Sequence, residues 1–187
     1  MAHARMVDVY IQHLLGELFD GAFQATGRGY RVPLTGGPLV EVLDGPGYLL
    51  RVRVTAPLAN DVACGRALLD AVNDVNTRLP YGRVLVEDGQ VLAEHTLLGR
   101  TLHRTGLDNA VRLIAWVVET FAAAIAHAGG GTPAEGATPV VTAGGADTPA
   151  PPGLLDADGV VTVGAGAGQL DLLDATPAPV ANAAGYL

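Results

Sequence analysis

The 187-residue sequence predicts an α+β domain with the element order α-β-β-β-α-β-β-α, in which helices pack on an antiparallel sheet. An Asp88-Gly89 pair separates two strand-like runs, which indicates a β-hairpin because a type I′ turn needs positive φ at both central positions. Segments with the apolar spacing of helices lie before and after this hairpin. Composition changes sharply after His127, so we expect the fold in residues 1–127 and a flexible tail in residues 128–187.

Charge and composition exclude several classes of function. Residues 1–127 hold 11 Arg and 13 acidic residues, whereas 128–187 hold six acidic residues and no Lys or Arg. The tail has 12 Gly and 7 Pro, which is typical of low-complexity sequence. A chain without a basic cluster is a poor ligand for phosphates, so we expect no nucleic-acid partner. Cys64 is the single Cys, so no intramolecular disulfide can form.

The sequence indicates a chain of the cytoplasm. No apolar core of a signal peptide follows the first residues. No uninterrupted apolar run approaches the roughly 18 residues of a membrane span, so we expect no membrane partner.

The first half of the domain predicts one helix and three strands. Apolar residues recur at helical spacing in 7–23. Alternating or apolar runs then predict three strands, at 30–35, 39–43 and 48–55. Pro33 cannot donate to a ladder, so the first strand is expected to lie at an edge or to be irregular. In the third strand Arg51 and Arg53 face away from the apolar residues, and Pro57 is expected to end the sheet.

The second helix is expected to start at a cap on Asn60 or Asp61 and to run to about Arg78. Apolar residues lie on two of its sides, with Val62 and Leu69 on the thinner stripe, which indicates burial on both sides.

Two Asn residues stand near the end of this helix, where Asn is otherwise disfavoured. We interpret Asn73 and Asn76 as ending the helix and anchoring the turn into the hairpin, in preference to contacting a ligand. The hairpin strands are predicted at 83–87 and 90–96. Residues 105–108 resemble a capping box for a last helix that runs to about His127 and is apolar around most of its circumference.

Few residues suggest chemistry. His95 and His103 lie near Glu94, which raises a metal site as an alternative, although no His or Cys has metal-ligand spacing. Cys64 has small apolar neighbours that favour packing over nucleophilic catalysis. We therefore predict no catalytic residue, no cofactor and no metal.

The run from Leu69 to Asn76 and the run Leu79-Pro-Tyr-Gly-Arg-Val-Leu-Val-Glu-Asp-Gly-Gln-Val-Leu-Ala-Glu94 resemble the YbjN-like branch of the type III secretion chaperone fold. The resemblance covers residues 5–127 by topology and 60–98 by motif. It implies a non-catalytic module, often a homodimer, that presents a sheet face or groove to an extended peptide or partner domain.

Apolar helix surface in excess of one small core predicts that a client or a second copy covers part of it. We expect a homodimer interface of about 800 Å² per partner. The candidate partner or dimer surface comprises Val62, Leu69, Leu113, Trp116, Arg51 and Arg53. A small-ligand or metal-dependent regulator or enzyme that uses His95 and His103 is one alternative, and a structural subunit of a larger assembly is another. The tail is either a linker or an occupant of the client surface through its apolar stretches at 160–163 and 170–173.

Overall fold

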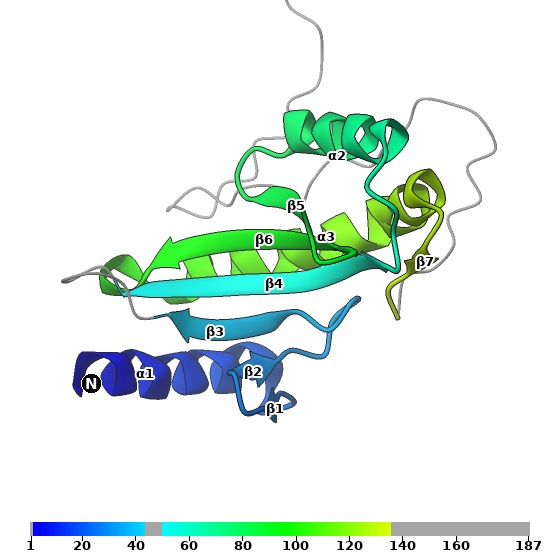
Figure 1. The fold of residues 1–187 in the computed structure, drawn as a ribbon. Coiled ribbons are helices and arrows are strands. Elements are labelled where there is room, and N and C mark those ends of the chain that lie inside the picture. The colour runs from blue at the N-terminus through cyan, green and yellow to red at the C-terminus, as the bar shows by residue number, and fades with distance from the viewer. Residues whose placement is uncertain (1, 44–49, 136–187) are drawn as a thin grey trace, which may run out of the picture. The chain divides into compact units, whose positions relative to one another are not determined.

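The computed structural model describes residues 2–43 and 50–135 and shows the predicted mixture of helices and antiparallel strands (Figure 1). The described elements, in chain order, are α1 (Ala2–Phe19), β1 (Gln24–Ala25), β2 (Tyr30–Arg31), β3 (Leu39–Leu43), β4 (Arg51–Asn60), α2 (Arg66–Arg78), β5 (Arg83–Glu87), β6 (Gln90–Leu98), a 3₁₀ turn (Gly99–Thr101), α3 (Arg104–Gly129) and β7 (Thr132–Pro133). The strands form one antiparallel sheet in the order β1-β2-β3-β4-β6-β5, and β7 pairs with β4.

The apolar helix α3 forms the centre of the core. It packs on β4, β6 and α2, and it passes behind β4 and β6 in Figure 1. Leu107, Ile114 and Val118 on this helix are at most 1% exposed. By length and composition α3 is the one described helix that is able to span a bilayer, but most of it is buried within the domain. Packing on two sides accounts for its hydrophobicity.

Strand β4 continues beyond the point where the sequence predicted its end. Pro57 pairs with Leu92 of β6, and the register shifts between Pro57 and Ala59. The pairing of β4 with β3 stops at Thr55, so at Pro57 the strand lacks its β3 neighbour. A bulge and a partial edge are the places where a sheet tolerates proline, because no ladder hydrogen bond is lost there. Residues 48 and 49 of the predicted strand lie outside the described part.

The helix starts and one helix end also differ from the sequence-based expectations. α2 begins at Arg66, and Asn60 belongs to β4 instead of capping the helix. α3 begins at Arg104 without a side-chain cap, and Asp108 pairs with Arg112 one turn later (2.8 Å). α1 ends at Phe19, because Asp20 and the residue after it take positive φ.

The hairpin prediction is confirmed, with Asp88 and Gly89 both at positive φ between β5 and β6. The predicted role of Asn76 is confirmed as well. Its Nδ2 donates to the Val84 carbonyl (2.9 Å), and the Val84 amide donates to its Oδ1 (2.7 Å). The Asn76 side chain thus connects the end of α2 to β5, and it bonds both backbone groups of Val84 as a neighbouring strand would. Asn73 is exposed on the helix surface.

The folded chain extends past the predicted boundary at residue 127. α3 ends at Gly129, β7 pairs with Ala59 and Asn60, and Ala134 is buried. These contacts attach residues up to 134 to the domain. The rest of the predicted tail, 136–187, lies outside the described residues.

Asn76→Ala is expected to lower the free energy of unfolding by about 1–3 kcal/mol, because it leaves two part-buried backbone groups of Val84 without partners. Asn73→Ala is the matched control on the same helix, and its effect should stay within about 0.5 kcal/mol. Urea unfolding of both variants measures the difference. Equal losses would show that Asn76 does not anchor the hairpin.

Candidate functional site

The sheet has two faces of different character, and β4 shows both. Val52, Val54 and Leu58 are fully buried toward α3. The intervening Arg51 and Arg53 are exposed or half-buried on the opposite side. No described helix covers this second side, which we call the open face. The predicted orientation of the two arginines is confirmed.

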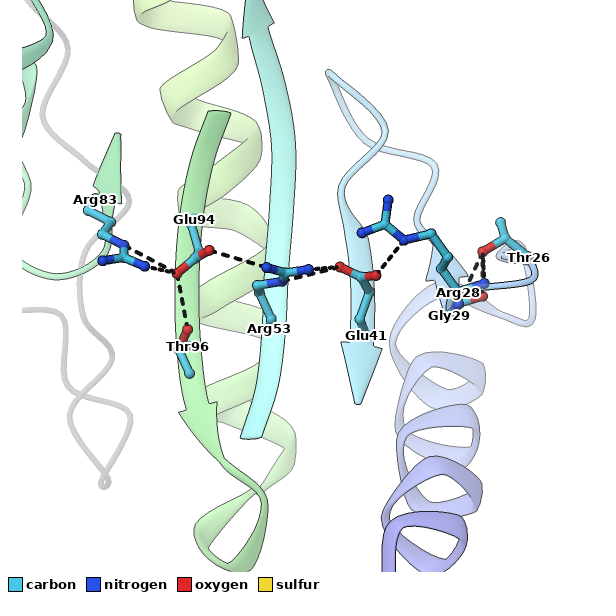
Figure 2. A network of polar contacts seen from close by, with 8 residues as sticks. All are labelled: Thr26, Arg28, Gly29, Glu41, Arg53, Arg83, Glu94 and Thr96. Atoms are coloured by element: carbon cyan, nitrogen blue, oxygen red, sulfur yellow. Dashed lines mark hydrogen bonds and ion pairs between the residues drawn. The ribbon is translucent and has the colours of Figure 1, made fainter. Parts of the chain in front are cut away.

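A row of alternating charges crosses the open face from β5 to the β1–β2 hairpin (Figure 2). Glu41 accepts from Arg28 Nε (2.9 Å) and from Arg53 Nη2 (2.9 Å). Glu94 accepts from Arg83 Nη2 (2.8 Å), and Arg53 Nη1 lies 3.7 Å from its second oxygen. Arg53 therefore stands between two carboxylates, and each carboxylate stands between two guanidinium groups.

The two carboxylates are hidden, although they lie on the open face. The side chain of Glu41 is 4% exposed and that of Glu94 is 11% exposed, whereas Arg28 and Arg83 at the ends of the row are 70% and 66% exposed. A buried carboxylate is strongly unfavourable unless it is paired and hydrogen-bonded. The arginine side chains supply this pairing, and they leave guanidinium groups at both ends of the row in contact with solvent.

A hollow of about 400 Å³ lies on the open face beside this row. Its lining includes apolar side chains from β3, β4 and β6, namely Leu39, Pro57 and Leu92. Charged side chains also line it, among them Arg31 of β2, Glu94 of β6 and Glu87 at the end of β5. The open face therefore combines apolar surface with ionic groups, as sites that hold a polypeptide segment do.

The outer edge of β5 offers little room for an added strand. β5 ends the sheet, and its Val84 amide and carbonyl already bond to Asn76 of α2. A peptide that adds a strand to a sheet needs such backbone groups unoccupied along the edge. At Val84 this edge is therefore already occupied by a side chain.

Comparison with protein families identifies the chain. Residues 39–137, just over half of its length, match the family described as T3SS (YopN, CesT) and YbjN peptide-binding chaperone 1. The chain belongs to this family. The match runs from β3 to just beyond β7, so the peptide-binding chaperone region includes most of the open face and all of α2 and α3. No curated protein matches the chain.

The structure does not bring the six sequence-predicted surface residues together. Two of them, Val62 (7% exposed) and Leu113 (2%), lie in the core of this chaperone domain and supply no partner surface. Val62 is buried because the last residue of α3, Gly129, has no side chain and lets the two segments lie close together. A Cβ on Gly129 would lie 2.8 Å from Val62 Cβ. Helical spacing in the sequence cannot distinguish a side buried by α3 from one left for a partner.

The other four residues lie in separate places. Leu69 is 50% exposed on α2. Trp116 is half-buried on α3, with its ring edge-on to Phe121 at a centroid distance of 5.4 Å. Arg51 and Arg53 belong to the open face.

The residues of the metal alternative point in different directions. Glu94 lies in the charged row, whereas the adjacent His95 faces the other side of β6 and contacts Tyr81 at a ring-centroid distance of 4.9 Å. Burial lowers the pKa of His95 and raises the pKa of Tyr81. His103 immediately precedes α3. Within residues 2–43 and 50–135, no three His, Cys, Asp or Glu side chains are grouped as metal ligands.

One exposed apolar surface was missed in the sequence. Met6 (65% exposed), Val9 (59%) and Tyr10 (41%) form a stripe on α1. Their spacing of three and four residues was a readable signal, because such residues share one helix face. The core-facing stripe of the same helix, which includes Ile11 and Leu15, concealed it.

Arg53→Met is expected to lower the free energy of unfolding by about 2 kcal/mol, because Glu41 and Glu94 both lose a partner while they stay buried. This value is below that for a fully buried pair because Arg53 is partly exposed. Arg51→Met, two residues away on the same face, is the control and should change stability by at most about 0.5 kcal/mol. Denaturant unfolding that gave equal values for both variants would contradict the role of the charged row.

Proposed function

We propose that this chain is a non-catalytic, chaperone-like module that binds an extended segment of a partner protein on the open face of its sheet. The observation that carries the proposal is the difference between the two faces. One face of the sheet is covered by α3. The other face has no described helix above it and contains the hollow, which is lined by apolar and charged side chains. Membership of a peptide-binding chaperone family supports the same class of ligand.

The charged groups of the open face suit binding better than catalysis. Each carboxylate of the row is held by arginines on both sides, so the oxygens of Glu41 and Glu94 already contact protein groups. A general acid or base must lie within hydrogen-bond reach of the proton that it transfers. We include a cytoplasmic location in the proposal, because most of the apolar helix α3 is buried within the domain.

We also propose that the chain forms a homodimer through α1 in place of the surface inferred from the sequence. Met6, Val9 and Tyr10 expose large apolar side chains on one helix face. Two copies related by a two-fold axis bury the same stripe on both sides, as isologous interfaces do. Burial of these side chains supplies the driving force for pairing.

The open face is tested with Thr55→Trp, which puts a large ring into the hollow at a β-compatible position. Twelve-residue peptides are first selected on the full chain from a random display library and then measured by fluorescence anisotropy. Thr55→Trp should weaken their binding at least about tenfold, because steric filling removes the apolar contact area. Leu69→Ser, on the exposed surface of α2, should leave the affinity unchanged.

The opposite pattern, in which Leu69→Ser weakens binding and Thr55→Trp does not, would place the site on α2. A selection that enriches no peptide above background would contradict the proposed function itself. Circular dichroism of both variants verifies that each remains folded.

The dimer is tested by light scattering of the full chain at micromolar concentration. The wild-type chain should give the mass of a dimer, and Val9→Glu should give that of a monomer because a charge in the apolar seam is desolvated without a partner. Gln12→Glu, on the exposed flank of the same helix, is the control. A monomeric wild-type chain would refute this interface.

A further inference from the structure

The hollow on the open face carries opposite charges at its two ends. Arg28 and Arg31 line it on the side of β2 and β3, whereas Arg53 of β4 and Glu94 of β6, which form an ion pair, line it on the central strands. Glu87 and Asp88 line it at the β5–β6 turn. The hollow is therefore basic at one end and acidic at the other, although the chain as a whole carries a net charge of −8.

Groups at both ends have capacity for a ligand. Arg28 bonds Glu41 through Nε, and Arg31 donates to the Gly37 carbonyl through Nη1 (3.0 Å). Within residues 2–43 and 50–135, the other N–H groups of both side chains have no acceptor. Among the described residues, no cation lies within ion-pair distance of Glu87 or Asp88. Both of these acidic side chains are exposed.

The surface between the ends is apolar and half-buried. Leu39, Pro57 and Leu92 come from three adjacent strands. Cross-strand register places them together: Leu39 is opposite Thr55, and Pro57 is opposite Leu92. Apolar side chains of a ligand gain by covering this surface.

The sheet sets the distance between the two ends. Strand order places β2 and β5 four strand spacings apart, and β3 and β5 three. At about 4.8 Å per spacing this gives roughly 14–19 Å across the strands. Arg31 is in register with Leu39, Thr55 and Glu94, whereas Glu87 is opposite Gln90, four residues further along β6, which adds roughly 13 Å along the strands. The ends are therefore roughly 20–23 Å apart, and an extended peptide at about 3.3 Å per residue covers that span in roughly six or seven residues.

We propose that the open face selects an extended segment with an acidic and a basic residue six or seven positions apart and apolar residues between them. The acidic residue binds at Arg28 and Arg31, and the basic residue binds at Glu87 and Asp88. A segment with two acidic residues meets repulsion at the β5–β6 turn, and one with two basic residues meets repulsion at the arginines. This inference rests on the proposed peptide-binding function and gives the chemistry of the ligand.

The test measures the binding of four fluorescein-labelled ten-residue peptides to the full chain. The peptides share the same background of Val, Leu and Thr. Two positions six residues apart hold Glu and Arg, Glu and Gln, Gln and Arg, or Gln and Gln. In fluorescence anisotropy the Glu/Arg peptide should bind tightest. Replacement of either charge by Gln should weaken binding about three- to fivefold, the range of a partly exposed ion pair.

Variants of the chain assign each end. In the double variant Glu87→Gln and Asp88→Asn, peptides with Arg or with Gln at the basic position should bind equally well. The Asn-Gly pair that this variant contains preserves the turn. With Arg31→Gln, the preference for a peptide Glu should fall about threefold. Glu119→Gln removes one exposed negative charge on α3 and should leave all four affinities as they are.

The outcomes separate the two proposals. If the four peptides bind equally and Thr55→Trp removes their binding, the charge selection is wrong and the peptide-binding face stands. If none of them binds, or Thr55→Trp leaves their binding intact, both proposals fail. A preference that survives in the Glu87 and Asp88 double variant would overturn the assignment of the acidic end.

Discussion

The pairing of two hidden carboxylates with arginines is the interaction on which the open face depends. Glu41 and Glu94 lie on the side of the sheet that no described helix covers, yet little of either side chain meets water. Arginine side chains cover them, and Arg53 joins the two pairs. A sheet face usually becomes dry when a second layer packs on it. Here ion pairs shield the carboxylates, and the face stays accessible.

The same interaction helps to fix strand register. Glu41 stands directly opposite Arg53, and Glu94 directly opposite Arg83. A slip of one residue would turn each partner to the other face and set it against α3, where a charge is costly. The charged row and the α3 core therefore favour one register. Asn76 adds to this by holding the outer edge of β5, so that the sheet is protected at that edge and open on its face.

Local features of the sequence predicted the local structure well. The Asp88-Gly89 turn, the role of Asn76 and the direction of Arg51 and Arg53 depend on neighbours within a few residues. The charged row was not predictable in this way, because it joins residues that lie up to 66 positions apart and requires knowledge of the register. The sequence argument that apolar surface exceeded the core failed at Val62 and Leu113. Glycine at the end of α3 lets the chain pack more closely there than side-chain spacing indicates.

Chemical-shift mapping on the ¹⁵N-labelled full chain, titrated with a selected peptide, tests the central claim most directly. The account predicts the largest amide shifts on the strands at the hollow, from Arg53 to Ala56 in β4 and at Leu92 and Glu94 in β6. Amides on the solvent side of α2 and along α3 should shift little. Shifts concentrated on α2 or α3, with the β4 and β6 amides unmoved, would contradict it.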